Sequence, residues 1–150
     1  MTKVRNIDSL KRKLAALASD AAVAKLEGAA FKGGMVVQEA AIVNIREYGL
    51  IDNGFMMNSV STVSRRETNY EAARMKAESV NSKEVMLPPP TPKQYQAITS
   101  VGAEYARYLH DGTSRGIQPH PFLRRAIDEN EKRIGEVVKK EVQKGIRSIV

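Results

Sequence analysis

The residues best suited to chemistry in this chain lie close together near position 110. His110 and Asp111 are followed by Ser114, and these are the three residue types of a Ser-His-Asp triad. Adjacent residues on a turn rarely align as a base and the group that orients it, and the chain has no Gly-x-Ser-x-Gly elbow. We therefore predict that these residues form a turn and that the protein is not an enzyme.

The same region offers weak starting points for a metal site and for a phosphate site. His110 and His120 are the only histidines, neither has another ligand at the i, i+4 spacing of a helix, and cysteine is absent. The segment Gly112-Thr-Ser-Arg-Gly116 could turn backbone amides toward a phosphate, but no Lys-Ser or Lys-Thr follows as in a phosphate-binding loop. We predict no metal and no cofactor.

Length and composition indicate one domain, residues 1–150, with a core of small and aliphatic side chains. Hydrophobic residues make up 42% of the chain, aromatic residues only 5%, and tryptophan is absent. This composition suits helices better than a large sandwich. No run approaches the roughly 18 apolar residues of a membrane-spanning helix, so we expect no membrane contact.

The net charge of +7 comes from 24 Lys and Arg against 17 Asp and Glu. Successive thirds of the chain carry +3, +1 and +3, so the excess is spread along the sequence. A spread excess favours a solubilising surface. Contact with nucleic acid or with acidic protein surfaces remains the alternative.

The N-terminal third is predicted to be helical. Asp8 could cap a first helix, whose apolar face repeats at steps of three and four residues. Because each glycine costs about 1 kcal/mol relative to alanine inside a helix, Gly33 and Gly34 favour a break there over a bend. The helical pattern then resumes as far as a left-handed cap at Gly49.

Two strands are predicted in the middle of the chain, at residues 55–64 and 95–101. The first follows the turn Asp52-Asn53-Gly54 and is rich in Val, Thr, Ser and Met. In the second, alternate residues fall on one face: Tyr95, Ala97, Thr99 and Val101.

Residues 65–93 connect the two strands and are predicted to form an extended loop or arm. A short helix is compatible with residues 71–78, but the prolines Pro88, Pro89 and Pro90 favour an extended backbone. A connection of this length in a small domain is usually functional or disordered. We expect it to become ordered against a neighbouring subunit.

Pro121 is predicted to start a long last helix, since a proline at the first helical position loses no hydrogen bond. Its apolar side runs from Leu123 to Ile149, its early residues are acidic and its late residues are basic, which matches the helix dipole. About thirty residues of helix extend about 45 Å, so part of this side is expected to pack against another chain. The predicted fold class is α+β: an N-terminal helical region, a small antiparallel sheet with a long loop, and a long C-terminal helix.

The stretch from Tyr105 to Ala126 resembles the small neck and tail-completion proteins of long-tailed double-stranded DNA bacteriophages. In that family, Tyr-Ala-x-Tyr-x-x-x-Gly-Thr and a polar linker precede Pro-Phe-Leu-x-x-Ala at the start of the last helix. The matching residues here are Tyr105, Ala106, Tyr108, Gly112, Thr113, Pro121, Phe122, Leu123 and Ala126. Residues 51–59 look like the family stretch that precedes the first strand, and they keep Gly54 and Ser59.

The resemblance implies a structural virion protein that forms a ring at the head–tail junction or at the top of the tail. The implied partners are other copies of the chain, head-closure, connector, and tail-tube or tail-terminator proteins, with packaged DNA nearby. The implied location is the virion neck or tail, and the host cytoplasm during assembly. The rival interpretation is a basic nucleic-acid-binding protein.

The candidate interaction residues come from two stretches. The default role of Tyr105, Tyr108 and Leu109 is core packing on one side of a short helix, and tyrosines also suit interfaces. The full set is Tyr105, Tyr108, Leu109, Gly112, Thr113, Arg115, Pro121, Phe122, Leu123, Pro88, Pro89 and Pro90.

Overall fold

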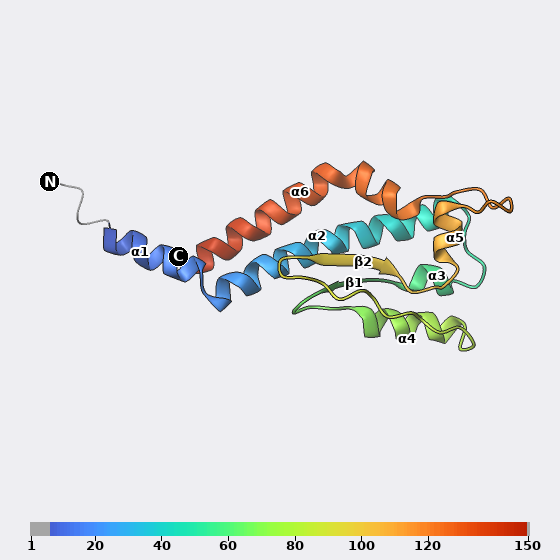
Figure 1. Cartoon of the computed structure of the whole chain (residues 1–150), viewed down its shortest axis with the longest axis horizontal. Helices are drawn as coiled ribbons and strands as arrows, with labels where there is room; N and C mark the ends of the chain where they lie inside the picture. The colour runs from blue at the N-terminus through green and yellow to red at the C-terminus, as the bar shows by residue number, and fades with distance from the viewer. Residues whose placement is uncertain (1–6, 150) are drawn as a thin grey trace.

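The computed structural model describes residues 7–149 and confirms the α+β class (Figure 1). The long last helix and the two-stranded antiparallel sheet are both present. In chain order the elements are α1 (Ile7–Leu17), α2 (Asp20–Glu47), α3 (Phe55–Asn58), β1 (Val60–Ser64), α4 (Tyr70–Val80), β2 (Ala97–Val101), α5 (Ala106–Asp111) and α6 (Phe122–Ile149).

Helix α2 forms the centre of the molecule, between α6 and the sheet (Figure 1). It runs antiparallel to α6, as shown by the ion pair between Lys32 and Glu141 at 2.9 Å and by the contact of Arg133 with Glu39. On its other side lie β1 and β2, with Val60 opposite Val101 and Ser64 opposite Ala97. Helix α4 packs beyond the sheet against α3 and β1.

The hydrophobic core lies at the end of the molecule where the C-terminal half of α2 meets α3, α5 and the start of α6. Ile45, Phe55 and Phe122 are its largest buried side chains, each at most 1% exposed. Small residues fill the spaces around them, chiefly Ala41, Ala77, Ala103, Ala106 and Ala126. The α1 end of the molecule has no comparable core, since no residue of α1 is buried.

The predicted break at Gly33 and Gly34 is wrong, because α2 runs through both glycines without interruption. The break comes at Ser19 instead, whose hydroxyl accepts a hydrogen bond from Ala22 N and caps the start of α2. The glycines are needed for close packing. A Cβ at Gly33 would lie 2.7 Å from Val138 of α6, and one at Gly34 would lie 2.6 Å from Thr62 of β1.

Gly34→Val is expected to lower the free energy of unfolding by about 3 kcal/mol, because the added methyls would force α2 away from the sheet. The residues of the sheet that face Gly34 have little room to move, since Thr62 is fully buried and Thr99 Oγ1 donates to the Gly34 carbonyl at 2.9 Å. Denaturant unfolding measures the change. Gly135→Ala in α6 is the control, because a Cβ there meets no atom within 4 Å and should stabilise the helix by about 1 kcal/mol. A Gly34→Val protein as stable as wild type would contradict this packing.

The predicted strand at residues 55–64 is correct only for its second half. The first half is helix α3. It is preceded by Gly54, which has the left-handed conformation (φ 86°), and the Asn53 side chain accepts a hydrogen bond from Phe55 N at 3.0 Å at the start of the helix. Phe55 and Met56 are both buried, and neighbouring residues of a strand point to opposite faces. A helical turn is what lets both side chains enter one core.

The other boundaries differ from prediction by smaller amounts. Asp8 lies inside the first turn of α1 and not before it. The second strand begins at Ala97, since Tyr95 has a positive φ of 62° that ends regular extended structure. Gly49 is the predicted left-handed residue after α2 (φ 70°). Pro121 directly precedes α6, and its carbonyl accepts from Arg125 N at 2.9 Å.

Residues 65–93 are not extended throughout. The helix compatible with residues 71–78 is present and longer, as α4, and buries Ala73 and Ala77. Further along, Met86 is 3% exposed, and the Tyr70 hydroxyl donates to its carbonyl at 3.0 Å. The extended backbone is confined to the stretch after α4, which includes the three prolines and packs partly on its own chain.

Candidate assembly surfaces

The stretch that carries the family resemblance forms the corner between α5 and α6. Phe122 is fully buried, its ring meets the His110 ring edge to face at 5.0 Å, and its carbonyl accepts from Asn44 Nδ2 at 3.0 Å. Leu123 packs half-buried beside it. Phe122 and Leu123 therefore hold the start of α6 against the end of α2.

The three residues predicted to cluster on α5 separate into two groups. Tyr105 and Leu109 pack against the core, and burial, followed by the charges of Glu84 and Asp52, raises the pKa of the Tyr105 phenol. Tyr108 points outward, 42% exposed, with the Arg107 guanidinium 4.7 Å from its ring centroid. Tyr108 is thus free for an interface, and the other two are not.

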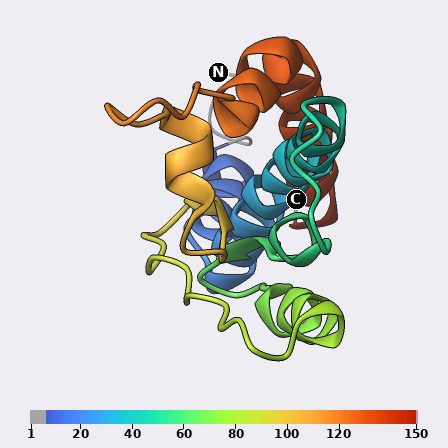
Figure 2. The same cartoon turned by 90° about the vertical axis from the view of Figure 1, so that its right-hand side faces the viewer.

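Residues 112–121 form a loop that projects from the body between α5 and α6 (Figure 2). Gly112 has φ 74°, and a Cβ there would lie 2.8 Å from the Ile117 carbonyl. Thr113 closes the loop, because its N–H donates to Ile117 O and its hydroxyl accepts from Ile117 N. Gly112 and Thr113 thus have structural roles, and Arg115 lies exposed in the loop.

His110 is engaged in the structure of this corner. Its Nδ1 lies 2.7 Å from Asp111 Oδ1, and its Nε2 accepts from Arg124 N at 3.4 Å. The nitrogen that a triad would direct at a serine therefore meets the first turn of α6. Within residues 7–149, no three or more His, Asp or Glu side chains gather as a possible metal site.

Among residues 7–149, no strand pairs with the edge of β2 that faces away from β1. Gly102 N donates to Ser59 O, so the antiparallel alternation directs the N–H and C=O groups of Ala97, Thr99 and Val101 to this free edge. Leu87 N donates to Gly102 O at 2.8 Å, directly after the end of β2. The prolines that follow have no N–H to donate, so the segment of Pro88, Pro89 and Pro90 does not continue this pairing along β2.

A groove of about 530 Å³ remains between the proline segment and the start of α6. Its wall is mostly apolar, and its lining includes Leu87, Pro90, Val101, Ala106, Phe122 and Leu123. We name this feature, with the free edge of β2, the β2 groove. An extended or helical segment of another chain could bind there through main-chain hydrogen bonds and apolar contacts.

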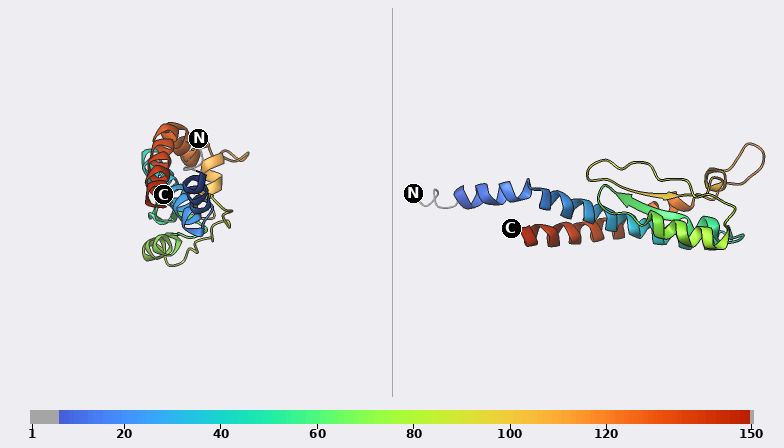
Figure 3. Two further views of the ribbon diagram at one scale, coloured as in Figure 1. Left: turned by 90° about the vertical axis from the view of Figure 1, so that its left-hand side faces the viewer. Right: turned by 90° about the horizontal axis from the view of Figure 1, so that it is seen from below.

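A second uncovered apolar surface lies on α1. The exposed fractions of Ile7, Leu10, Leu14 and Leu17 are 46%, 56%, 57% and 39%, and their spacing of three, four and three residues places them on one side of the helix. We name these four residues the α1 stripe. Figure 3 shows α1 extending beyond the body, past the C-terminal end of α6.

The amphipathic pattern of α1 was readable in the sequence, but the sequence did not show that its apolar side faces solvent. Most of the predicted apolar side of α6 does pack inside the chain, with Ile134 and Val138 facing Gly33. Ile127 and Ile146 stay partly exposed, at 49% and 39%.

The sequence gives no sign of the ion pair between Glu27 and Arg66. Glu27 is 1% exposed, although nothing in the local sequence distinguishes it from the exposed Glu39 of the same helix.

No helix within residues 7–149 has both the length and the apolar character to span a bilayer. Comparisons of the chain with protein-family models, with curated proteins and with solved structures find no match.

Proposed function

We propose that this chain is a structural subunit of a tailed-bacteriophage virion, part of a ring at the head–tail junction or at the top of the tail. Its task there would be to join the DNA-filled head to the tail through contacts with copies of itself and with neighbouring neck or tail proteins. It would work in the virion, after assembly in the host cytoplasm. The proposal assigns the chain no reaction.

The observation that carries the proposal is the pair of uncovered apolar surfaces at opposite ends of the long axis. The α1 stripe lies at one end, and the β2 groove lies beside α5 near the other (Figure 1). An isolated helix of 11 residues is marginal in water. Because no residue of α1 is buried by the rest of residues 7–149, contact with another chain would stabilise it.

Two different surfaces on one subunit are what a ring requires. Head-to-tail contacts join unlike surfaces, and they close into a ring when the rotation between subunits allows it. The tailed-phage assignment rests on the resemblance at residues 105–126. There the motif residues Phe122 and Ala126 are buried and set the corner of α5 and α6, and Tyr108 remains available at the surface.

Replacing Leu10 and Leu14 together by serine is expected to abolish assembly of the purified protein. Covering a half-exposed leucine is worth about 1–2 kcal/mol, and each 1.4 kcal/mol changes an association constant tenfold. Two losses at every subunit contact add to about 2–4 kcal/mol and would therefore weaken each contact by about 30- to 700-fold. Light scattering coupled to size exclusion, over a range of concentrations, measures the mass of the assembly.

Met75→Ser is the matched control, because Met75 is 68% exposed on α4 and belongs to neither surface. It should leave the mass of the assembly unchanged. In a phage that encodes this chain, the double variant should give unjoined heads and tails by electron microscopy. A wild-type protein that stays monomeric at every concentration, or that is missing from purified particles, would defeat the proposal.

A further inference from the structure

Within residues 7–149, the net positive charge is gathered at one end of the fold. Residues 7–32 and 138–149 contain nine Lys and Arg against four Asp and Glu, a net charge of +5, whereas residues 33–137 contain thirteen of each and are neutral. The two charged segments are neighbours in space, since Gly145 of α6 packs on Lys25 of α2 and Ile149 shares a hollow with Arg12 and Lys13 of α1. We name these two segments the basic end.

The acidic side chains of the basic end do little to neutralise it. Glu27 and Asp20 both face Arg66, which belongs to the neutral part of the chain, at 3.0 and 3.8 Å. Glu141 pairs with Lys32, and the nearby charges of Lys144 and Lys140 further lower the pKa of that carboxyl. Eight cations of the basic end form no ion pair with any residue from 7 to 149: Lys11, Arg12, Lys13, Lys25, Lys139, Lys140, Lys144 and Arg147.

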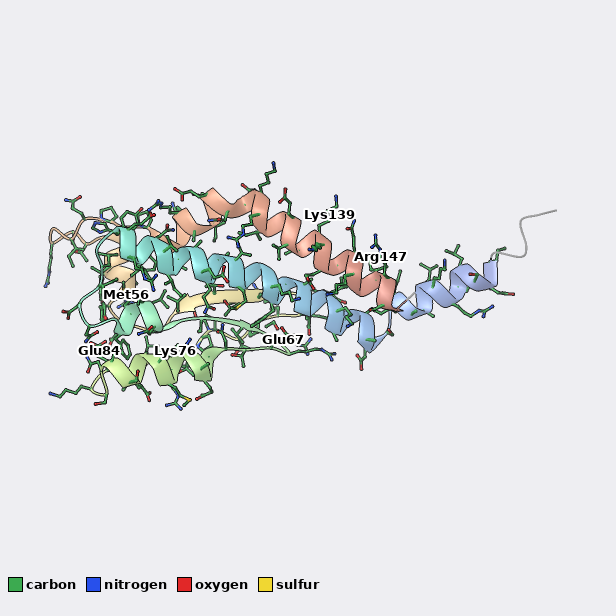
Figure 4. All side chains as sticks on the ribbon, turned by 180° about the vertical axis from the view of Figure 1, so that it is seen from behind. Met56, Glu67, Lys76, Glu84, Lys139 and Arg147 are labelled. Atoms are coloured by element: carbon green, nitrogen blue, oxygen red, sulfur yellow. The ribbon has the colours of Figure 1, made fainter. Side chains whose placement is uncertain are left out.

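Four of these cations form a strip on the exposed side of α6. Lys139, Lys140, Lys144 and Arg147 are all exposed, and they span about 12 Å of the helix at 1.5 Å per residue. Lys139 and Arg147 both project from α6 into solvent in Figure 4. A duplex carries one negative charge per about 1.7 Å of its axis, so about seven phosphates lie within the length of the strip.

We propose that the basic end binds the phosphate backbone of duplex DNA without sequence preference. Electrostatic contact alone supplies nearly all of non-specific DNA binding, and the basic end offers that contact without a pocket for a base. An acidic protein fits the strip on α6 less well, because a protein interface needs a desolvated apolar centre, and the α1 stripe of the same end is assigned above to contacts between copies of the chain. Between Lys139 and Arg147 the one large apolar side chain with high exposure is Ile146, at 39%. The proposal stands whether or not the chain is a virion component.

The test compares two variants of the full chain that each lose four cations. One carries Lys139→Gln, Lys140→Gln, Lys144→Gln and Arg147→Gln. The control carries Lys76→Gln, Lys83→Gln, Lys93→Gln and Arg115→Gln, which are also three lysines and one arginine, all exposed and all in the neutral part. Both proteins have the same net charge of +3, so a difference between them reports the position of the cations and not their number.

Binding to a fluorescent 30-base-pair duplex is measured by anisotropy between 50 and 200 mM salt. The basic-end variant should bind about tenfold or more weakly than wild type, and its slope of log affinity against log salt should flatten by about 3.6, since each phosphate contact contributes about 0.9. The control should follow wild type. Size exclusion of both variants separates a loss of DNA binding from a loss of assembly.

Two results would overturn the proposal. Equal weakening of binding in both variants would mean that net charge alone governs it. The second result comes from measuring, in parallel, how tightly the protein binds vesicles of phosphatidylserine and phosphatidylcholine. If they bind the protein more tightly than DNA does, and if the Leu10→Ser, Leu14→Ser variant loses that binding, the basic end serves a membrane surface.

Discussion

Phe122→Ala is expected to lower the free energy of unfolding by about 3–5 kcal/mol, the cost of emptying a buried aromatic site. Phe122 is 1% exposed and touches three parts of the fold: the His110 ring of α5, Asn44 of α2 through its carbonyl, and the apolar residues around Ala126. The void could not close easily, because α2 and α6 are held together along most of their length. Urea or guanidinium unfolding followed by circular dichroism measures the loss.

Tyr108→Ala is the matched control from the same motif. Tyr108 is 42% exposed and contacts Arg107 at the surface, so its loss should change stability by about 0.5 kcal/mol or less. If Tyr108 belongs to an interface, this variant keeps its stability and loses assembly. Similar unfolding curves for the two variants would show that Phe122 does not anchor the corner.

Arg66→Met is expected to lower the free energy of unfolding by about 3 kcal/mol, because it leaves a buried carboxylate without its partner. Glu27 is 1% exposed, Arg66 Nε donates to its Oε2 at 3.0 Å, and Oε1 has no hydrogen-bond partner among residues 7–149. Arg66 itself is 47% exposed, so its own loss from the surface costs little. Most of the loss in stability comes from the unpaired Glu27 carboxylate that remains buried.

The double variant Glu27→Met, Arg66→Met separates a lost charge pair from lost packing. With both charges replaced by apolar side chains, its stability should return to within about 1 kcal/mol of wild type. Arg65→Met is the control, since Arg65 is exposed and in no ion pair within the described chain. A double variant as unstable as Arg66→Met would mean that the guanidinium matters through its packing.

Much of the fold could be predicted because its signals are local. The apolar side of α6 repeats at helical spacing up to Ile149, and Pro121 and Gly49 mark a helix start and a helix end. Local signals failed where the partner was distant. Gly33 and Gly34 resemble a helix break in the sequence, and only the approach of Val138 and Thr62 explains why a continuous helix needs them.

The candidate surfaces could also be predicted only where their signals are local. The stretch from Tyr105 to Ala126 predicted a helix start at Pro121, but it did not separate the partly buried Tyr105 and Leu109 from the exposed Tyr108. Tyr108 and Leu109 are neighbours in α5, and a rotation of about 100° around the helix axis separates the outward side chain from the inward one. Which side faces inward depends on where α2 and the sheet lie.

The sequence by itself determined the long last helix, the left-handed end of α2 at Gly49, the presence of two strands and the size of the positive charge, because spacing and side-chain type act over a few residues. Only the tertiary structure decided that the α1 stripe stays uncovered, that the edge of β2 is free beside the prolines, and that the charge collects at one end. The antiparallel pairing of α2 with α6 brings the start of α2 beside the end of α6, where Gly145 packs on Lys25. Charges that look spread along the sequence become neighbours because folding sets distance in space independently of distance along the chain.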